Sequence, residues 1–299
     1  MHMKLWLIIA IVLIVIGCVL FAANMTLLDW DFSKLSPVKY ETTEHRVIGE
    51  YTNISVITDT ADIAFVISEN ADTTVVCCEQ ENMKHTVATA DGILRITVED
   101  TSKWYEHIGI NFGSPTITLH IPQGKYGSLS IQSSTGDVNI PKDFSFESID
   151  ILESTGDVTS CASVSGSVKI STSTGDIAIE HITADSLALT VSTGKVNLST
   201  IRCQNVISTG NTGDISLQDV IATERFSIKR STGDVKLNSC DAGEIYIETN
   251  TGRVSGSLLS DKVFITKTDT GSVHVPKTTN GGRCEITTNT GDIKITVKG

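Results

Sequence analysis

The side chains best placed to act together are aspartates that recur at one position of a repeated phrase, Thr-Gly-Asp. They are Asp137, Asp157, Asp176, Asp214, Asp234 and Asp292. Carboxylates on successive turns could bind calcium, or could act as acids and bases in a polysaccharide-active enzyme. The uninterrupted run Asp137, Asp157 and Asp176 is the candidate calcium site, because Lys195 follows it at the same position and Arg253 follows Asp234.

The repeat offers these aspartates a simpler role, since a carboxylate after a glycine can accept hydrogen bonds from turn amides. Calcium-binding β-rolls repeat about every nine residues, whereas the phrase here recurs every 19 or 20 residues. No further carboxylate accompanies the aspartates at a constant position, and the histidines have no triad-like context. We therefore expect turn-bonded or solvated carboxylates, no catalytic residues and no cofactor.

A second group of candidate residues is aromatic. Trp104, Tyr105 and Phe112 gather within residues 102–113 of a chain that contains only 5% aromatic residues. This segment is either a loop whose rings are buried against the end of the fold, or an exposed contact loop. The contact would be with a glycan, a protein partner or a membrane surface.

The cysteines suggest no site of their own. There are seven of them, an odd number, and no Cys-x-x-Cys spacing occurs. Neither a zinc site nor a disulfide framework is indicated, and most of the cysteines are expected to be small buried apolar residues.

The elements that must position these residues follow from the repeat. Its glycines lie 19 or 20 residues apart, with threonine before each one, at Gly136, Gly156, Gly175, Gly194, Gly213, Gly233, Gly252, Gly271 and Gly291. Apolar residues alternate at period two on both sides of the glycine, as in β-strands, and the inward parity changes at the glycine. Each unit is therefore a strand, a glycine corner, a second strand and a return loop. Units of this kind stack into an all-β, single-chain β-solenoid.

The C-terminal end of the stack carries its own expectation. The last coil, residues 284–297, is expected to present an unpaired strand edge. Lys294 and Lys298 would then discourage another chain from adding there, and Gly291 would be supported on one side only.

The chain divides into four parts. Residues 1–24 form a transmembrane anchor or signal segment, 25–45 a tether, 46–125 irregular leading β coils that cap the stack, and 126–299 the regular solenoid. The formal net charge is −12. No basic stripe is available for phosphates, so nucleic acid is not an expected partner.

The segment from Leu5 to Ala23 is uncharged and mostly apolar, with the length of a membrane-spanning helix. Lys4 precedes it and Asp29 follows it, which predicts a cytoplasmic N-terminus and an extracytoplasmic domain. Two alternatives involve cleavage: an ordinary signal peptide, or a lipoprotein signal in which Cys18 is lipidated. The retained helix is the favoured interpretation.

From about Arg46 onward the sequence resembles the bacterial putative-adhesin family of unknown function. The resemblance is carried by the Thr-Gly-Asp coils, the less regular leading half, and the join from Ile117 to Pro122 followed by Tyr126. The N-terminal helix is similar to that of LiaG-like members associated with envelope stress. The resemblance implies a membrane-anchored β-solenoid and brings no catalytic residues.

Function is expected to be non-enzymatic. The favoured hypothesis is a cell-surface adhesion or binding module whose partner is a surface glycan or an envelope protein. The alternative is an envelope-stress accessory or sensing protein that works through membrane partners. A polysaccharide-active solenoid enzyme is the second alternative, and it would need the clustered carboxylates that the repeat does not supply.

Overall fold

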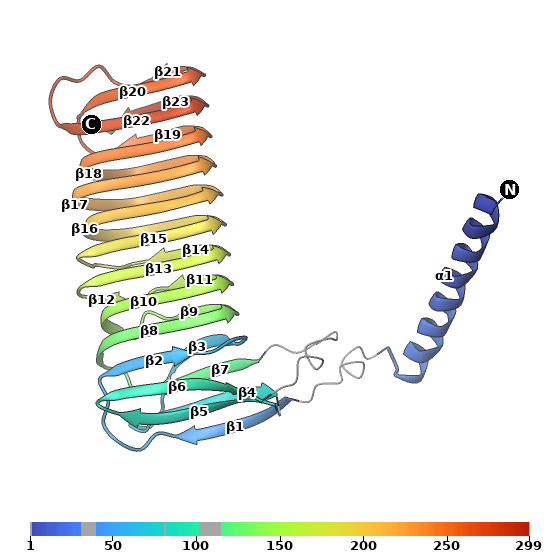
Figure 1. The fold of residues 1–299 in the computed structure, drawn as a ribbon. Helices are drawn as coiled ribbons and strands as arrows, with labels where there is room; N and C mark the ends of the chain where they lie inside the picture. The colour runs from blue at the N-terminus through green and yellow to red at the C-terminus, as the bar shows by residue number, and fades with distance from the viewer. Residues whose placement is uncertain (1, 31–39, 81, 102–114, 299) are drawn as a thin grey trace.

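The protein is a β-solenoid preceded by one apolar helix, which confirms the predicted fold class (Figure 1). The computed structural model describes residues 2–30, 40–80, 82–101 and 115–298. Helix α1 spans His2–Leu27, and its residues from Trp6 to Phe21 are exposed. The window Trp6–Leu27 is long and apolar enough to cross a membrane. Such a helix suits either a membrane anchor or a secretion signal.

Two sets of strands follow the helix. Those of the leading part are β1 (Tyr40–Arg46), β2 (Asn53–Ile57), β3 (Asp62–Ile67), β4 (Thr74–Gln80), β5 (Met83–Ala90), β6 (Ile93–Asp100) and β7 (Thr116–Ile121). Those of the regular stack are β8 (Lys125–Thr135), β9 (Val138–Ile140), β10 (Ser145–Thr155), β11 (Val158–Ser160), β12 (Ser163–Val164), β13 (Ser167–Thr174), β14 (Ile177–Glu180), β15 (Ser186–Thr193), β16 (Val196–Thr212), β17 (Ile215–Thr232), β18 (Val235–Thr251), β19 (Val254–Leu258), β20 (Lys262–Thr270), β21 (Val273–His274), β22 (Gly282–Thr290) and β23 (Ile293–Val297).

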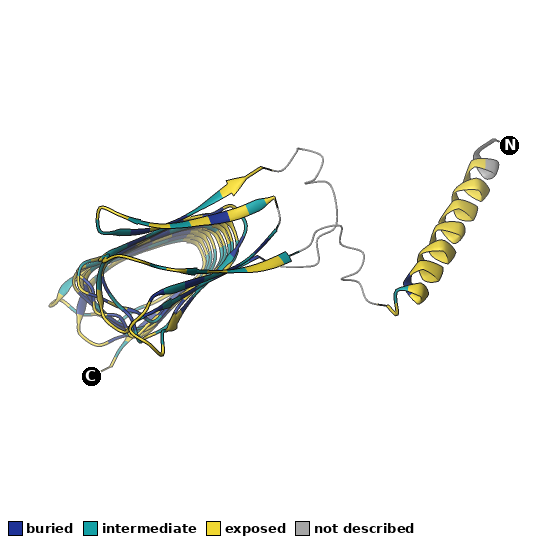
Figure 2. Cartoon of the chain, turned by 90° about the horizontal axis from the view of Figure 1, so that it is seen from below, coloured by how far each residue is buried: buried dark blue, intermediate teal, exposed yellow. Residues whose placement is uncertain are grey.

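The stack has two parallel faces, one before the glycine corner and one after it. On the first face Leu129 and Ile131 of β8 lie in register with Ile149 and Ile151 of β10. All four side chains are at most 1% exposed. In Figure 2 buried and exposed residues alternate along the ribbon of the coils, because successive side chains of a strand point to opposite faces. Burying an aliphatic side chain contributes about 1.5–3 kcal/mol, so the shared core, not any single coil, holds the fold together.

The leading part extends this stack and then closes it. Strands β2 and β3 form a coil that pairs in parallel with β8 and β9, and β6 and β7 continue it below. Beyond them the pairing turns antiparallel, with β5 on β6 and β4 on β7, and β1 pairs with β4. The change of direction ends the parallel ladder at this end of the solenoid.

At the C-terminal end the coils do not stack in chain order. Strand β22 lies between β18 and β20, and β23 lies between β19 and β21. The final coil is therefore inserted one level below the coil that precedes it (Figure 1). The expectation that residues 284–297 form the open edge was wrong, and the outermost coil is that of β20 and β21.

The side chains give a reason for this order. The inserted coil places Cys284, Ile286, Ile293 and Ile295 in the core, each at most 2% exposed. The outermost coil packs Phe264 and Val275 partly against the core, has threonine at the inward position 266, and leaves Val273 exposed. The inserted coil thus has Ile286 at the register position where the outermost coil has Thr266, which suits the more enclosed level.

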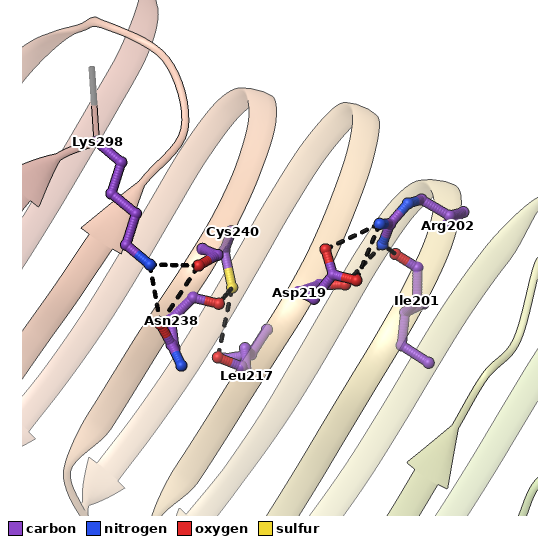
Figure 3. A network of polar contacts seen from close by, with 8 residues as sticks. Ile201, Arg202, Leu217, Asp219, Asn238, Cys240 and Lys298 are labelled. Carbon is purple, nitrogen blue, oxygen red and sulfur yellow. Dashed lines mark hydrogen bonds and ion pairs between the residues drawn. The ribbon is translucent and has the colours of Figure 1, made fainter.

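Lys294 and Lys298, which were expected at an open strand edge, consequently lie elsewhere in the stack. Lys294 pairs in register with Ser255 on one side and His274 on the other. The Lys298 ammonium donates hydrogen bonds to Ser239 Oγ at 2.6 Å and to Asn238 Oδ1 at 3.5 Å (Figure 3). Neither residue protects an open strand edge.

A row of buried positions, three residues before each corner glycine, breaks the apolar pattern. Arg230 is 2% exposed, and its Nη1 donates a hydrogen bond across two coils to Val191 O at 2.9 Å. Gly210, on the coil between them, has no side chain, and an added Cβ would collide with this guanidinium. Burial lowers the pKa of Arg230. A small residue on one coil thus makes room for a large buried cation on the next.

Glu153 occupies the same row near the other end. It is 2% exposed, and neither carboxylate oxygen has a hydrogen-bond partner in the described part of the chain. Burial is the main cause that raises its pKa to about 8, and the carboxylates of Asp137, Asp62 and Asp157 add to the effect. This folded-state pKa lies above the unfolded value of about 4.3. The folded protein therefore binds the extra proton, and the free energy of unfolding falls as pH rises from about 4 to about 8.

We expect Glu153→Gln to remove this alkaline loss of stability, because the amide needs no proton to remain neutral. The gain above pH 8 is at most about 5 kcal/mol by the size of the pKa change. Thermal unfolding of the full chain in detergent at pH 4 and pH 9 measures it. The variant should match the wild type at pH 4 and melt higher at pH 9, and equal melting at both pH values would contradict the assignment.

Candidate binding face

The aspartates of the repeat are hydrogen-bonded from coil to coil at the glycine corner. The Asp137 carboxylate accepts the backbone N–H of Asp157 at 2.8 Å, and Asp157 accepts that of Asp176 at 2.7 Å. The same bond continues from Asp176 to the N–H of Lys195. Each carboxylate thus takes up an amide of the neighbouring coil, which is the turn-bonded role expected of it.

The same hydrogen bond explains why a basic residue can stand in the aspartate series, and it recurs in the exchanged coils at the C-terminal end. Arg253 donates its backbone N–H to Asp234 at 2.8 Å, so a residue of either charge can occupy the receiving position. Asp292 accepts the backbone N–H of Ser272 at 2.8 Å, although Ser272 precedes it in the chain, because the two coils are exchanged. The backbone and hydroxyl hydrogen bonds from Ser272 lower the pKa of Asp292.

The geometry of the glycine corner bears on whether its aspartates bind calcium. Among the described residues, three or more metal-ligating side chains come within 4.8 Å of one another at a single place, and it is not the run Asp137, Asp157 and Asp176. One oxygen of Asp137, Asp157 and Asp176 already accepts an amide hydrogen. The arrangement favours solvated, turn-bonded carboxylates.

We therefore expect the midpoint of thermal unfolding to be nearly the same in EDTA and in millimolar calcium. A ligand that binds only the folded state stabilises it by RT ln(1 + [L]/Kd), so the midpoint rises when the ligand concentration exceeds Kd. The measurement uses the full chain in detergent. A rise of many degrees in calcium that disappears in Asp157→Asn would instead establish a calcium site in the ladder.

The aromatic segment proposed for contact lies outside the described residues, together with Trp104, Tyr105 and Phe112. The described part of the chain offers a different aromatic residue on an open face. Tyr246 of β18 is half-buried and points outward from the stack. The Arg225 guanidinium lies 4.8 Å from the centre of its ring, and that of Arg283 lies 5.7 Å away. Both distances are typical of cation–π contacts.

This ring lies in a shallow groove of about 340 Å³, here called the Tyr246 groove. Its lining comes from β17, β18 and β22, and consists of Arg225, Ser227, Ile228, Lys229, Tyr246, Ile247, Glu248, Glu285 and Thr287. The inserted position of β22 places Glu285 directly beside Tyr246. Without the exchange of coils, that edge of the groove would be formed by Ile265.

Ion pairs hold the charged side chains of the groove in place. Arg225 contacts Glu244 at 3.2 Å, Lys229 contacts Glu248 at 3.0 Å, and Arg283 contacts Glu285 at 2.6 Å. A second shallow groove continues past Arg225 and includes Asn205, Ile207 and Glu224. The face therefore combines an aromatic ring with alternating donors and acceptors along several coils.

Sequence reasoning missed Tyr246, although a signal was present. The position six residues before the corner glycine faces outward in every regular unit, and Tyr246 is the aromatic residue found there. An outward aromatic residue in a repeat built from small polar side chains points to a contact surface.

A comparison with known protein families gives one match. The family model described as Toastrack DUF4097 matches residues 51–205 and 166–299. No curated protein matches the sequence.

Solved structures resemble the chain at low sequence identity. A putative adhesin from Parabacteroides distasonis is 10% identical with a TM-score of 0.50, covering 87% of this chain and 98% of its own. A putative adhesin from Bacteroides fragilis is 19% identical with a TM-score of 0.47, covering 86% and 97%. A putative lipid binding protein from Parabacteroides distasonis is 15% identical with a TM-score of 0.48, covering 86% and 97%. The first of these structures shares the fold of this chain.

Proposed function

The chain belongs to the Toastrack DUF4097 family, and from that premise we propose that it is a membrane-anchored, extracytoplasmic and non-enzymatic binding module. The partner that suits it is a surface polysaccharide, bound along the face that contains the Tyr246 groove. The names of the solved structures, which include putative adhesins, agree with this class of function.

The observation that carries the proposal is the outward Tyr246 ring with Arg225 and Arg283 at its sides. A tyrosine ring can pack against the apolar face of a sugar while its hydroxyl remains in water. The flanking guanidinium and carboxylate groups can exchange their ion pairs for hydrogen bonds to sugar hydroxyls. A repetitive, open face suits a repetitive ligand, whereas small molecules are usually bound in enclosed pockets.

The experiment is binding of the full chain, in detergent, to an array of bacterial polysaccharides. Tyr246→Ala should weaken binding by about tenfold or more, since aromatic residues dominate binding energies at such surfaces. Lys229→Ala should weaken it less. Lys169→Ala is the matched control, because Lys169 pairs with Asp150 at 3.5 Å on the same face but away from the groove.

Equal binding by wild type and Tyr246→Ala would reject the groove as the site. The absence of any polysaccharide binding, combined with crosslinking of the anchored chain to membrane proteins in intact cells, would favour the envelope-sensing alternative.

The anchor is the segment from Leu5 to Ala23, retained in the mature protein. Its exposed apolar helix fits this role. Protease added to wall-stripped cells should remove the solenoid, and protection of the solenoid would reject the topology. If Cys18 is lipidated instead, Cys18→Ala should abolish labelling by a fatty-acid probe.

A further inference from the structure

The leading part of the fold contains a buried cluster of three metal-ligating side chains. Cys77 and Glu79 lie two residues apart on the inward face of β4, and His85 lies on β5, which follows it. Their side chains are 0%, 1% and 5% exposed. One ligand atom of each, a sulfur, an oxygen and a nitrogen, lies within 4.8 Å of the other two.

The cluster is already arranged by hydrogen bonds. Glu79 Oε2 accepts the backbone N–H of His85 at 2.6 Å and lies 3.0 Å from His85 Nδ1. The other ring nitrogen, Nε2, lies 3.0 Å from Thr58 Oγ1. The orientation of the imidazole is therefore fixed from both sides, as it is for histidines that bind metals.

The cluster contains a buried carboxylate, Glu79, whose negative charge a bound cation would neutralise. A buried carboxylate is unfavourable without a partner, and the described residues give Glu79 only His85 as an ion-pair partner. The same Glu79 oxygen contacts both the backbone N–H and the ring of His85, and no cation other than this histidine pairs with it among the described residues. A neutral imidazole is the form that ligates metals, but it does not balance the carboxylate.

We propose that Cys77, Glu79 and His85 bind a zinc ion. Zinc accepts mixed sulfur, nitrogen and oxygen ligands at about 2.0–2.3 Å, and the three ligand atoms of this cluster already lie within 4.8 Å of one another. The thiolate and the carboxylate together balance the charge of the ion, and a neutral buried site results. Calcium and magnesium prefer all-oxygen sites, which this cluster does not provide.

Binding must move two protons. Burial, with a contribution from Glu79, raises the pKa of Cys77 to about 12. Zinc displaces this proton, which is released to the solvent as the zinc–sulfur bond forms. When Nδ1 ligates the ion, the ring proton resides on Nε2 and is donated to Thr58 Oγ1. Atoms and charge then balance without an oxidant or reductant.

His45 of β1 is a candidate fourth ligand, although it lies outside the 4.8 Å cluster. His45 Nε2 is buried and has no hydrogen-bond partner among the described residues. If His45 completes a tetrahedral site, the ion joins β1, β4 and β5. These are the antiparallel strands that close this end of the solenoid. The ion would then link β1, the strand that follows α1, to β4 and β5.

The test is zinc binding by the full chain purified in detergent. Equilibrium dialysis against zinc, followed by elemental analysis, should give one ion per chain. Cobalt in place of zinc should give a thiolate-to-cobalt charge-transfer absorption. Both results should be lost in Cys77→Ser and in the isosteric variant Glu79→Gln. Zinc should also raise the melting temperature by several degrees in the wild type and leave that of Glu79→Gln unchanged.

Cys284→Ser is the matched control. Cys284 is also fully buried, and burial likewise raises its pKa to about 12, but it lies in the core far along the chain. This variant should retain both the ion and the cobalt absorption. Absence of bound zinc from the folded wild-type chain, or cobalt absorption lost in Cys284→Ser and kept in Cys77→Ser, would overturn the proposal.

Discussion

Gly213→Val is expected to destabilise the solenoid by about 3 kcal/mol or more, far beyond an ordinary surface substitution. Gly213 has a φ of +131°, which a β-branched residue adopts poorly. An added Cβ would also come closer than 3.0 Å to the carbonyl oxygen of Gly194 on the preceding coil. The two effects add, because backbone strain and the collision with a neighbouring coil are separate costs. Chemical unfolding of the full chain, followed by circular dichroism, measures the change.

The matched variant is Gly271→Val, in the outermost coil. Its added Cβ would approach Gly291 O, but no coil stacks on the other side, so the coil can shift outward. We expect a smaller loss there. The sequence had assigned this weaker position to Gly291, which was wrong, because Gly291 lies between Gly252 and Gly271. A Gly291→Val variant should therefore behave like Gly213→Val. Small and equal losses in all three variants would contradict a strained corner.

The coil architecture could be predicted because its information is local and repeated. A glycine at constant spacing, with apolar residues alternating on both sides, specifies a corner and two strands in each unit. The aspartate after Gly136 could likewise be assigned to a turn, since its bond to the next coil depends only on the repeat. Because every coil of the repeat has similar neighbours, one structural assignment applies to all the coils.

What the repeat could not predict depends on differences between copies. The exchange of the last two coils preserves the glycine spacing and changes only which coil is a neighbour of which. The missing side chain of Gly210 makes room for the guanidinium of Arg230 on the next coil. Neither residue, taken alone in the sequence, predicts this packing. The cluster of Cys77, Glu79 and His85 has no recognised ligand spacing, because an antiparallel turn in the irregular part brings it together.

Asp241→Ala is expected to destabilise the protein by about 3–5 kcal/mol, because it leaves a buried ammonium group without its carboxylate. Lys262 Nζ lies 2.6 Å from Asp241 Oδ1, with the two side chains 5% and 18% exposed. Lys262 begins β20, and Asp241 belongs to β18, two strands that are separated by the inserted β22. The ion pair therefore spans the exchanged coils, and we expect it to fix their order.

Two controls separate a buried charge from a general loss of contacts. Asp269→Ala removes an exposed carboxylate that pairs with Lys267 at 3.4 Å in the same outer coil, and such pairs contribute at most about 1 kcal/mol. The double variant Asp241→Leu with Lys262→Met replaces the pair by apolar side chains, so it should recover most of the stability that Asp241→Ala loses. Chemical unfolding of all three variants decides the point. If Asp241→Ala is no less stable than Asp269→Ala, the pair does not hold the inserted coil, and the apolar residues of β22 and β23 must specify the exchange by themselves.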